Sequence, residues 1–235
     1  MGNWKVPCDT SLNRLRRLLK VFLAEEDEQA PEVALKIAEH LREDSKHDRK
    51  ETTEAYANAS AIAQTFPFDD TEEREWALRD AVGDWAEYLA EQQDISNLVS
   101  LVRTVGSDKE LIEAVGAGNL VHRMRASGNI DPAIEAAKEL SAEIAAVKAN
   151  LEVANICAEW AQALADSGRS PEAIEVCERA LSSGWLSRDL ANRHSLILER
   201  AKDWHRALEV CNMGLELAPG DEQLSKRRAR CLQHL

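Results

Sequence analysis

The 235-residue chain is acidic, with 29 basic against 42 acidic side chains and a net charge of −13. Because phosphate binding depends on clustered Lys and Arg, this charge disfavours a nucleic-acid-binding protein. Apolar residues make up 44% of the chain but aromatic residues only 5%, a balance that favours an all-helical protein over a β-sandwich or barrel.

No membrane span or secretory leader is apparent in the sequence. It has no run of about 18 apolar residues, and its first residues, MGNWKVPCDTS, lack the apolar stretch of a signal peptide. The five cysteines are odd in number and show no C-x-x-C spacing, which argues against a disulfide framework and a zinc site. Four of them fall at apolar helical positions, where a free thiol behaves as a small hydrophobe: Cys157, Cys177, Cys211 and Cys231. We therefore expect a soluble cytoplasmic protein.

Three helices are expected before residue 70. The first, from Asp9 to about Asp27, is amphipathic with a basic face, which suits either a membrane or partner helix or, as we favour, the solvated face of an end helix. The second begins at Pro31, and 42–50 is a polar loop. The third spans residues 51–64 and ends before Pro67. No sequence repeat is evident here, so we expect 1–70 to be a region of divergent repeats or a cap, continuous with the repeat domain that follows in 71–235.

Helix starts in the middle of the chain are marked by capping residues. Pairs of the capping-box type open two helices, one with Asp70 and Glu73 and one with Ser107 and Glu110. Between them, either Asp94 or Ser96 opens a third helix.

Two glycines, Gly116 and Gly118, interrupt the helical pattern that continues to Gly128. Each costs about 1 kcal/mol of helix propensity relative to alanine. The segment is therefore either one weakened helix or two helices that meet near these glycines.

An internal repeat dominates the C-terminal part of the chain. The stretch SPEAIEVCERAL returns 34 residues later as WHRALEVCNMGL, so that Ala173 corresponds to Ala207. This period is typical of stacked helical hairpins. Asp131 and Ser170 are expected N-caps, each followed by a proline. The spacing from Ala133 to Ala173 exceeds the repeat by six residues, so we expect longer helices or a longer turn in 141–153. The final segment, 221–235, reads as a capping helix with a basic face.

At these positions the chain resembles the tetratricopeptide repeat (TPR) family. One unit is carried by Ala161, Gly168, Ala173, Ala180 and Leu181, with Trp185 where the family has proline. The next is carried by Ser195, Ala207, Gly214, Leu215 and Pro219, and a third, partial unit by Val121, Gly128 and Ala133. The aromatic residues that the family has in its first helix are replaced in this chain by Cys157, Leu164 and Leu198. The resemblance implies an all-α, right-handed superhelical array of antiparallel helix hairpins, a TPR-like solenoid, over 71–235 with a C-terminal capping helix.

The resemblance also implies a binding face. In this family the first helices of successive hairpins line a concave groove that holds a segment of another protein. Transferred to this chain, the predicted peptide-binding residues are Asn119, His122, Asn155, Gln162, Asn192, Arg193, Leu196 and Arg200, with Ala158 and Glu159 on the same face. Leu196 is a candidate apolar anchor. Family members that clamp a carboxylate use Lys, Asn and Arg here, and this chain has no Lys in the set. His194 falls at a core-facing position, where we expect a hydrogen-bonded interior histidine.

Motifs of catalysis are not found: the sequence has no Gly-rich phosphate loop, no H-E-x-x-H and no G-x-S-x-G. We therefore expect no catalytic residues, no metal site, no cofactor and no enzyme. The leading interpretation is a scaffold or adaptor that binds another protein or peptide, without nucleic acid or membrane. The alternatives are a structural subunit of a homo-oligomer or larger assembly that uses its end faces and, ranked below these, a helical-repeat RNA binder or an enzyme.

Overall fold

The computed structural model describes residues 12–25, 27–43, 48–68, 71–106 and 108–235, and within these ranges the regular structure is entirely helical. Contacts divide the chain into two compact units, 1–89 and 90–235. The sequence predicts that residues 1–70 and 71–235 are two regions of one continuous array, and this division stays a prediction. Each unit is described by itself.

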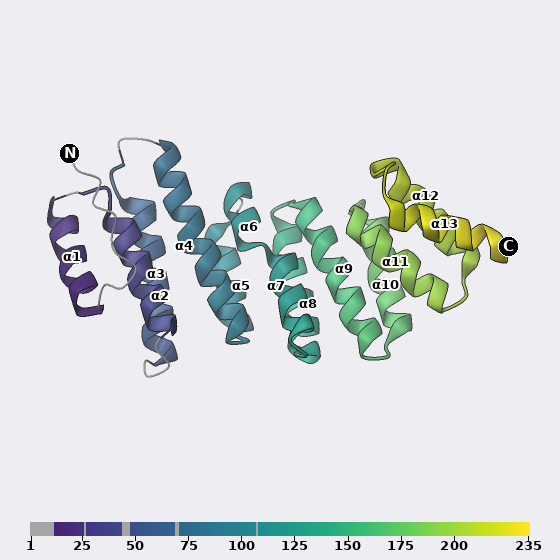
Figure 1. Cartoon of the computed structure of the whole chain (residues 1–235), viewed down its shortest axis with the longest axis horizontal. Coiled ribbons are helices and arrows are strands. Elements are labelled where there is room, and N and C mark those ends of the chain that lie inside the picture. The colour runs from purple at the N-terminus through teal and green to yellow at the C-terminus, as the bar shows by residue number, and fades with distance from the viewer. Residues whose placement is uncertain (1–11, 26, 44–47, 69–70, 107) are drawn as a thin grey trace. The chain divides into compact units, whose positions relative to one another are not determined.

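The N-terminal unit contains α1 (Leu12–Glu25), α2 (Ala30–Glu43), α3 (Arg49–Thr65) and most of α4 (Thr71–Glu91) (Figure 1). Leu15 of α1 packs with the apolar residues of α2, among them Val33 and Leu41. Small residues from α2, α3 and α4 meet at Ala34, Ala59 and Ala81. The basic face of α1 is exposed, but most of its leucines are covered by α2, so the helix is part of this core.

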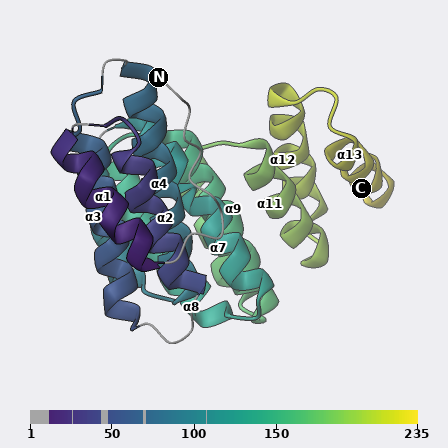
Figure 2. The same ribbon diagram turned by 60° about the vertical axis from the view of Figure 1, so that its left-hand side comes forward.

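The C-terminal unit contains α5 (Ile95–Val105), α6 (Lys109–Val115), α7 (Ala117–Ala126), α8 (Ile130–Ala146), α9 (Asn150–Asp166), α10 (Ser170–Ser182), α11 (Arg188–Arg200), α12 (Trp204–Leu217) and α13 (Glu222–His234). From α7 onward each helix packs against the next, and α7, α9, α11 and α13 also pack against one another in that order. Figure 2 shows α11, α12 and α13 as consecutive neighbours at the C-terminal end. This pattern confirms the predicted array of helical hairpins with a C-terminal capping helix.

Small residues lie where the repeat predicts close helix crossings. Ala161 and Ala173, and likewise Ser195 and Ala207, are 0% exposed. Gly214 marks the tightest approach, since a Cβ at this position would lie 2.7 Å from the Cβ of Ala191 and 2.7 Å from Cδ1 of Leu224. The spacing from Ala133 to Ala173 is six residues longer than the repeat because α8 and α9 are long helices of 17 residues each.

Several helix starts differ from the sequence prediction by one or two residues. Helix α6 is capped by Asp108, whose carboxylate accepts from the backbone N–H groups of Glu110 and Leu111. Ser107, the predicted cap, lies outside the described residues. Asp131 and Ser170 lie inside their helices instead of capping them. Asp94, not Ser96, caps α5. Asp70 lies outside the described residues.

The glycine-rich segment forms two helices, α6 and α7, which meet at Gly116. Gly116 adopts a left-handed conformation with φ of +57°, which an L-residue rarely takes. This conformation ends α6 and begins α7 one residue later. The two-helix alternative is therefore correct.

The four cysteines expected in the core are buried, free thiols. Burial raises the pKa of Cys157 and Cys211 to about 11, so these thiols stay neutral near pH 7 and pack as small hydrophobes. Cys8 lies outside the described residues. In the part of the chain that the structure describes, no helix combines the length and hydropathy needed to cross a bilayer.

Candidate functional site

A groove of about 680 Å³ runs along the first helices of the hairpins in the C-terminal unit. Its lining comes from four helices, α7, α9, α11 and α13, which stack in that order. We call it the α7–α13 groove. Its lining residues are Gly118, Asn119, His122, Glu152, Asn155, Glu159, Arg188, Asp189, Asn192, Arg193, Asp221, Glu222, Gln223 and Arg227.

Side-chain amides are distributed along the whole groove. Asn119 comes from α7, Asn155 from α9, Asn192 from α11 and Gln223 from α13. Asn119 and Gln223 are exposed, whereas Asn155 and Asn192 are half-buried. An amide carries both a donor and an acceptor, so the row can hydrogen-bond N–H and C=O groups of any extended backbone.

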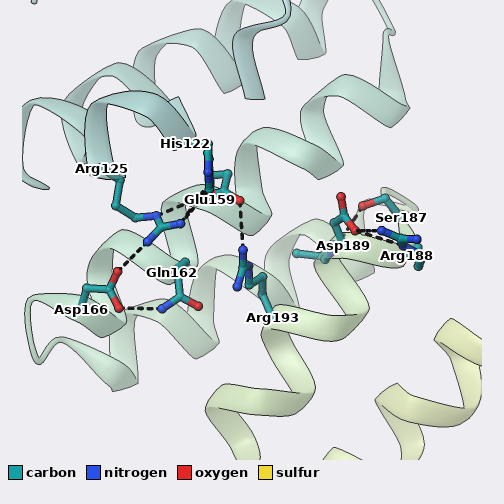
Figure 3. A network of polar contacts seen from close by, with 10 residues as sticks. His122, Arg125, Glu159, Gln162, Asp166, Ser187, Arg188, Asp189 and Arg193 are labelled. Atoms are coloured by element: carbon teal, nitrogen blue, oxygen red, sulfur yellow. Dashed lines mark hydrogen bonds and ion pairs between the residues drawn. The ribbon is translucent and has the colours of Figure 1, made fainter. Parts of the chain in front are cut away.

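The carboxylate of Glu159 connects three first helices (Figure 3). Its Oε2 atom lies 3.1 Å from the guanidinium of Arg125 and 3.1 Å from Nδ1 of His122, both on α7. Its Oε1 atom lies 3.5 Å from Arg193 on α11. Arg125 also pairs with Asp166 at 3.0 Å. The side chains of Glu159 and Arg125 are only 14% exposed, so this cluster is fixed in the floor of the groove.

A second connection joins α7 to α9 next to the first. Oε1 of Glu152 accepts from the backbone N–H of Gly118 at 2.8 Å. Burial raises the pKa of Glu152, while the Gly118 N–H and Asn155 bonds oppose that shift. Gly118 permits the approach, because a Cβ there would lie only 3.1 Å from the Cβ of Asn155. Gly118 therefore allows α7 and α9 to pack closely, a role that its low helix propensity does not reveal.

The groove is more acidic than basic, and its arginines already have partners. Five carboxylates line it, those of Glu152, Glu159, Asp189, Asp221 and Glu222, against Arg188, Arg193 and Arg227. Arg188 pairs with Asp189 at 3.0 Å, as Figure 3 also shows. Arg227 pairs with Glu199 at 3.0 Å, where both side chains are largely buried. Hydrogen bonds from Leu224 N–H and Asn192 and the charge of Arg188 lower the pKa of Asp221, so it stays ionised.

Five of the eight predicted site residues line this single groove: Asn119, His122, Asn155, Asn192 and Arg193. Gln162 is 6% exposed and donates from Nε2 to Asp166 at 2.6 Å, away from the groove lining. Leu196 is half-buried and Arg200 is exposed, and neither is among the lining residues. Ala158 is 0% exposed, so it lies beneath the face and does not line it.

His194 is buried, as the sequence predicts, but the expected hydrogen bond is wrong. Neither ring nitrogen has a hydrogen-bond partner among the described residues, and the residue is 2% exposed. Burial lowers its pKa to about 4. The imidazole is therefore neutral at pH 7 and packs as an interior side chain.

Sequence reasoning missed the contributions of α13 and of the first turns of α9 and α11. Gln223 and Arg227 lie on a helix that the repeat pattern assigns to a cap, yet they extend the groove by one helix. Gly118–Glu152 and Arg125–Glu159 each join residues 34 positions apart, but the matching repeat positions of these units, such as Ala133 and Ala173, are 40 apart, so the repeat did not point to these two connections. Within the described residues, no group of three or more His, Cys, Asp or Glu side chains is placed to hold a metal ion.

Comparisons with known proteins assign no function to the chain. No protein-family model and no curated protein matches the sequence. Among solved structures, the TPR domain of P58(IPK) is similar with 13% identity and a TM-score of 0.42, over 95% of this chain and 65% of that one. TTC0263, a thermophilic TPR protein of Thermus thermophilus, shows 14% identity and a TM-score of 0.39, over 95% of this chain and all of that one.

A putative kinesin light chain of Podosopora anserina with nearly identical TPR-like repeats shows 13% identity and a TM-score of 0.38, over 94% of this chain and 97% of that one. The array of helical hairpins is established by the packing of the helices in the chain itself. At these identities and scores no residue role or partner is transferred. The chain spans 65% of the P58(IPK) domain, so nothing of that protein's activity is assigned to it.

Proposed function

We propose that this protein is a non-catalytic interaction scaffold that holds an extended segment of another protein in the α7–α13 groove. The observation that supports this most directly is the row of amides, Asn119, Asn155, Asn192 and Gln223, contributed by four successive helices. The buried free thiols of the same unit suit the reducing conditions of the cytoplasm, where we place the protein.

The groove is suited to a peptide backbone because it is polar and is held in place before binding. Glu159 and Glu152 tie α7, α9 and α11 together through buried contacts. A segment that binds therefore does not have to order the groove, which reduces the entropy lost on binding. The amides would supply the hydrogen bonds that the segment loses when it leaves water.

The charge of the groove favours a neutral or basic segment over an acidic one. Each lining arginine is already paired with a carboxylate, so an incoming carboxylate would have to compete with Glu159, Asp189 or Glu199. The five lining carboxylates outnumber the arginines, which would attract Lys or Arg of a partner. A carboxylate clamp at Arg193 is not supported by this pairing.

The test uses arrays of N-acetylated, C-amidated peptides in matched basic, neutral and acidic sets. We expect binding to the basic and neutral sets to exceed binding to the acidic set, with the difference shrinking as salt is raised. A groove variant with Asn119→Ala, Asn155→Ala and Gln223→Ala should lose this binding, because it removes three of the four amides that would bond the peptide. The variant removes the bond from Asn155 to Glu152 but leaves the Glu152 bond to Gly118 and the ion pairs of Glu159 in place.

The matched control changes three exposed amides that lie outside the groove, Asn58→Ala, Gln64→Ala and Gln233→Ala. It should bind as the wild type does. Equal binding by the groove variant and the wild type, with both shown to be folded by circular dichroism, would remove the groove from consideration as the peptide site.

A further inference from the structure

A second pocket, of about 360 Å³, lies between α8, α9 and α10 and shares no lining residue with the α7–α13 groove. We call it the Trp160 pocket. Its lining residues are Lys138, Ser141, Ala142, Ala145, Cys157, Trp160, Val176, Arg179, Ala180, Ser183 and Trp185. Its volume falls in the range of sites for small ligands.

Small residues from both α8 and α10 line the pocket. Ala142 and Ala145 line it from α8, and Ala180 and Ser183 from the end of α10. Trp185, at the position where the related repeats have proline, is half-buried and supplies part of the wall. The lining is thus mainly apolar, with aromatic surface available for contact.

Cys157 adds apolar surface to this pocket. Its side chain is 4% exposed, and burial raises the pKa of its thiol to about 11, so it carries no charge near pH 7. The thiol packs beneath the lining as a small hydrophobe.

The charged residues of the pocket are both cations. Lys138 and Arg179 line it, no carboxylate does, and neither cation forms an ion pair among the described residues. The guanidinium of Arg179 lies 5.4 Å from the ring centroid of Trp160, which places a positive charge over the aromatic wall. In a chain of net charge −13, two unpaired cations beside an apolar hollow form a distinct electrostatic feature.

Trp160 also has an unsatisfied donor. Its Nε1–H is buried and has no hydrogen-bond acceptor among the described residues. A buried donor without a partner costs free energy, and an acceptor that reached it would recover that loss. Because the indole nitrogen is buried, this donor does not itself select the ligand; its NMR signal reports on changes in the pocket wall.

We propose that the Trp160 pocket binds a small amphiphilic carboxylate, with its hydrocarbon part against Trp160, Trp185 and the alanines and its carboxylate beside Lys138 and Arg179. The apolar lining supplies most of the affinity, and the two cations select an anion over a neutral molecule. This site is independent of the proposed peptide groove.

The probe is octanoate, titrated into the whole chain by calorimetry, with the indole Nε1–H signal of Trp160 followed by NMR and assigned with a Trp160→Phe variant. We expect saturable binding that shifts this signal. From hexanoate to octanoate the affinity should rise by about fourfold for each added methylene, the value for a buried CH₂ group. Octanamide, which lacks the charge, should bind more weakly than octanoate.

Variants locate the site on the structure. Ser183→Phe, at an exposed position on the rim, should fill the pocket and abolish binding without a change to the core. Lys138→Gln should weaken octanoate binding by about twofold to fivefold, the range of an exposed charge pair, and leave octanamide binding unchanged. Lys109→Gln, an exposed lysine outside the pocket, is the matched control and should have no effect.

Absence of saturable octanoate binding would overturn the proposal. So would octanoate binding that Ser183→Phe and Lys138→Gln leave unchanged, since the probe would then sit elsewhere on the chain.

Discussion

The close approach of α11, α12 and α13 at Gly214 gives a sharp test of how the array is packed. Replacing this glycine by alanine has two opposite effects. The substitution favours the helical backbone of α12 by about 1 kcal/mol, because glycine is a poor helix former. It also adds a methyl group 2.7 Å from Ala191 Cβ and 2.7 Å from Leu224 Cδ1.

The steric effect should exceed the backbone effect. The attractive contact distance between carbon atoms is about 3.5–4.0 Å. Leu224 can rotate its methyl groups away, but the Cβ of Ala191 is fixed to the backbone of α11, so α11 and α12 must separate. Overpacking of this kind costs about 1–3 kcal/mol. After the gain in helix propensity, we expect Gly214→Ala to lower the free energy of unfolding by up to about 2 kcal/mol.

The assay is urea unfolding followed by circular dichroism, with Gly220→Ala as the control because a Cβ there meets nothing within 4 Å. The control should leave the midpoint unchanged or raise it slightly. Ala191→Gly removes the opposing methyl, so in that background Gly214→Ala should no longer destabilise, giving a coupling energy of about 0.5–3 kcal/mol. A Gly214→Ala variant more stable than the wild type would refute this account of the helix crossing.

Two further predictions concern buried polar groups. Glu159→Gln should lower the free energy of unfolding by about 1–3 kcal/mol, because Arg125 loses a charged partner where its side chain is only 14% exposed; the exposed Glu175→Gln is the control in the same urea experiment, and equal midpoints for both variants would contradict the role of Glu159. Burial lowers the pKa of His194 from 6.5 to about 4, so the unfolded chain binds a proton more readily than the folded chain between these pH values. The stability associated with neutral His194 should therefore be present above pH 6.5 and be lost as the pH falls towards 4, by about 3 kcal/mol. His194→Gln should remove this part of the pH dependence, and unfolding curves with the same pH dependence in both proteins would show the reasoning to be wrong.

The hairpin array could be predicted from the sequence because its energetics are local and repeated. A small residue at a crossing position, such as Ala173, recurs 34 residues later as Ala207, and both are fully buried.

Helix starts were less predictable. Ser107 and Asp108 are adjacent and both are good N-cap residues, so sequence alone does not separate them, and the structure uses Asp108.

The candidate site was predictable where helix phase alone decides which way a side chain points. Asn119, Asn155 and Asn192 line the groove for this reason. Gln162 has the same phase but lies within reach of Asp166, one helical turn away, and this local bond holds it away from the lining. The N-terminal half of α13 was missed because a capping helix repeats the fold of a first helix without repeating its sequence.

The charge pairing of the groove follows from the stacking of the first helices. In such a stack, side chains of one first helix face those of the next. Glu159 and Arg193 are one repeat of 34 residues apart. Arg125 and Glu159 are also 34 residues apart, but the matching positions of their units, such as Ala133 and Ala173, are 40 apart, so this pair comes from helix packing and not from the repeat length. Composition does not show this arrangement, since a count of charges says only that the chain is acidic. The positions of the charges do show it: Glu159 lies between Arg125 and Arg193 and pairs with both, which leaves the amides and the remaining carboxylates to meet a partner.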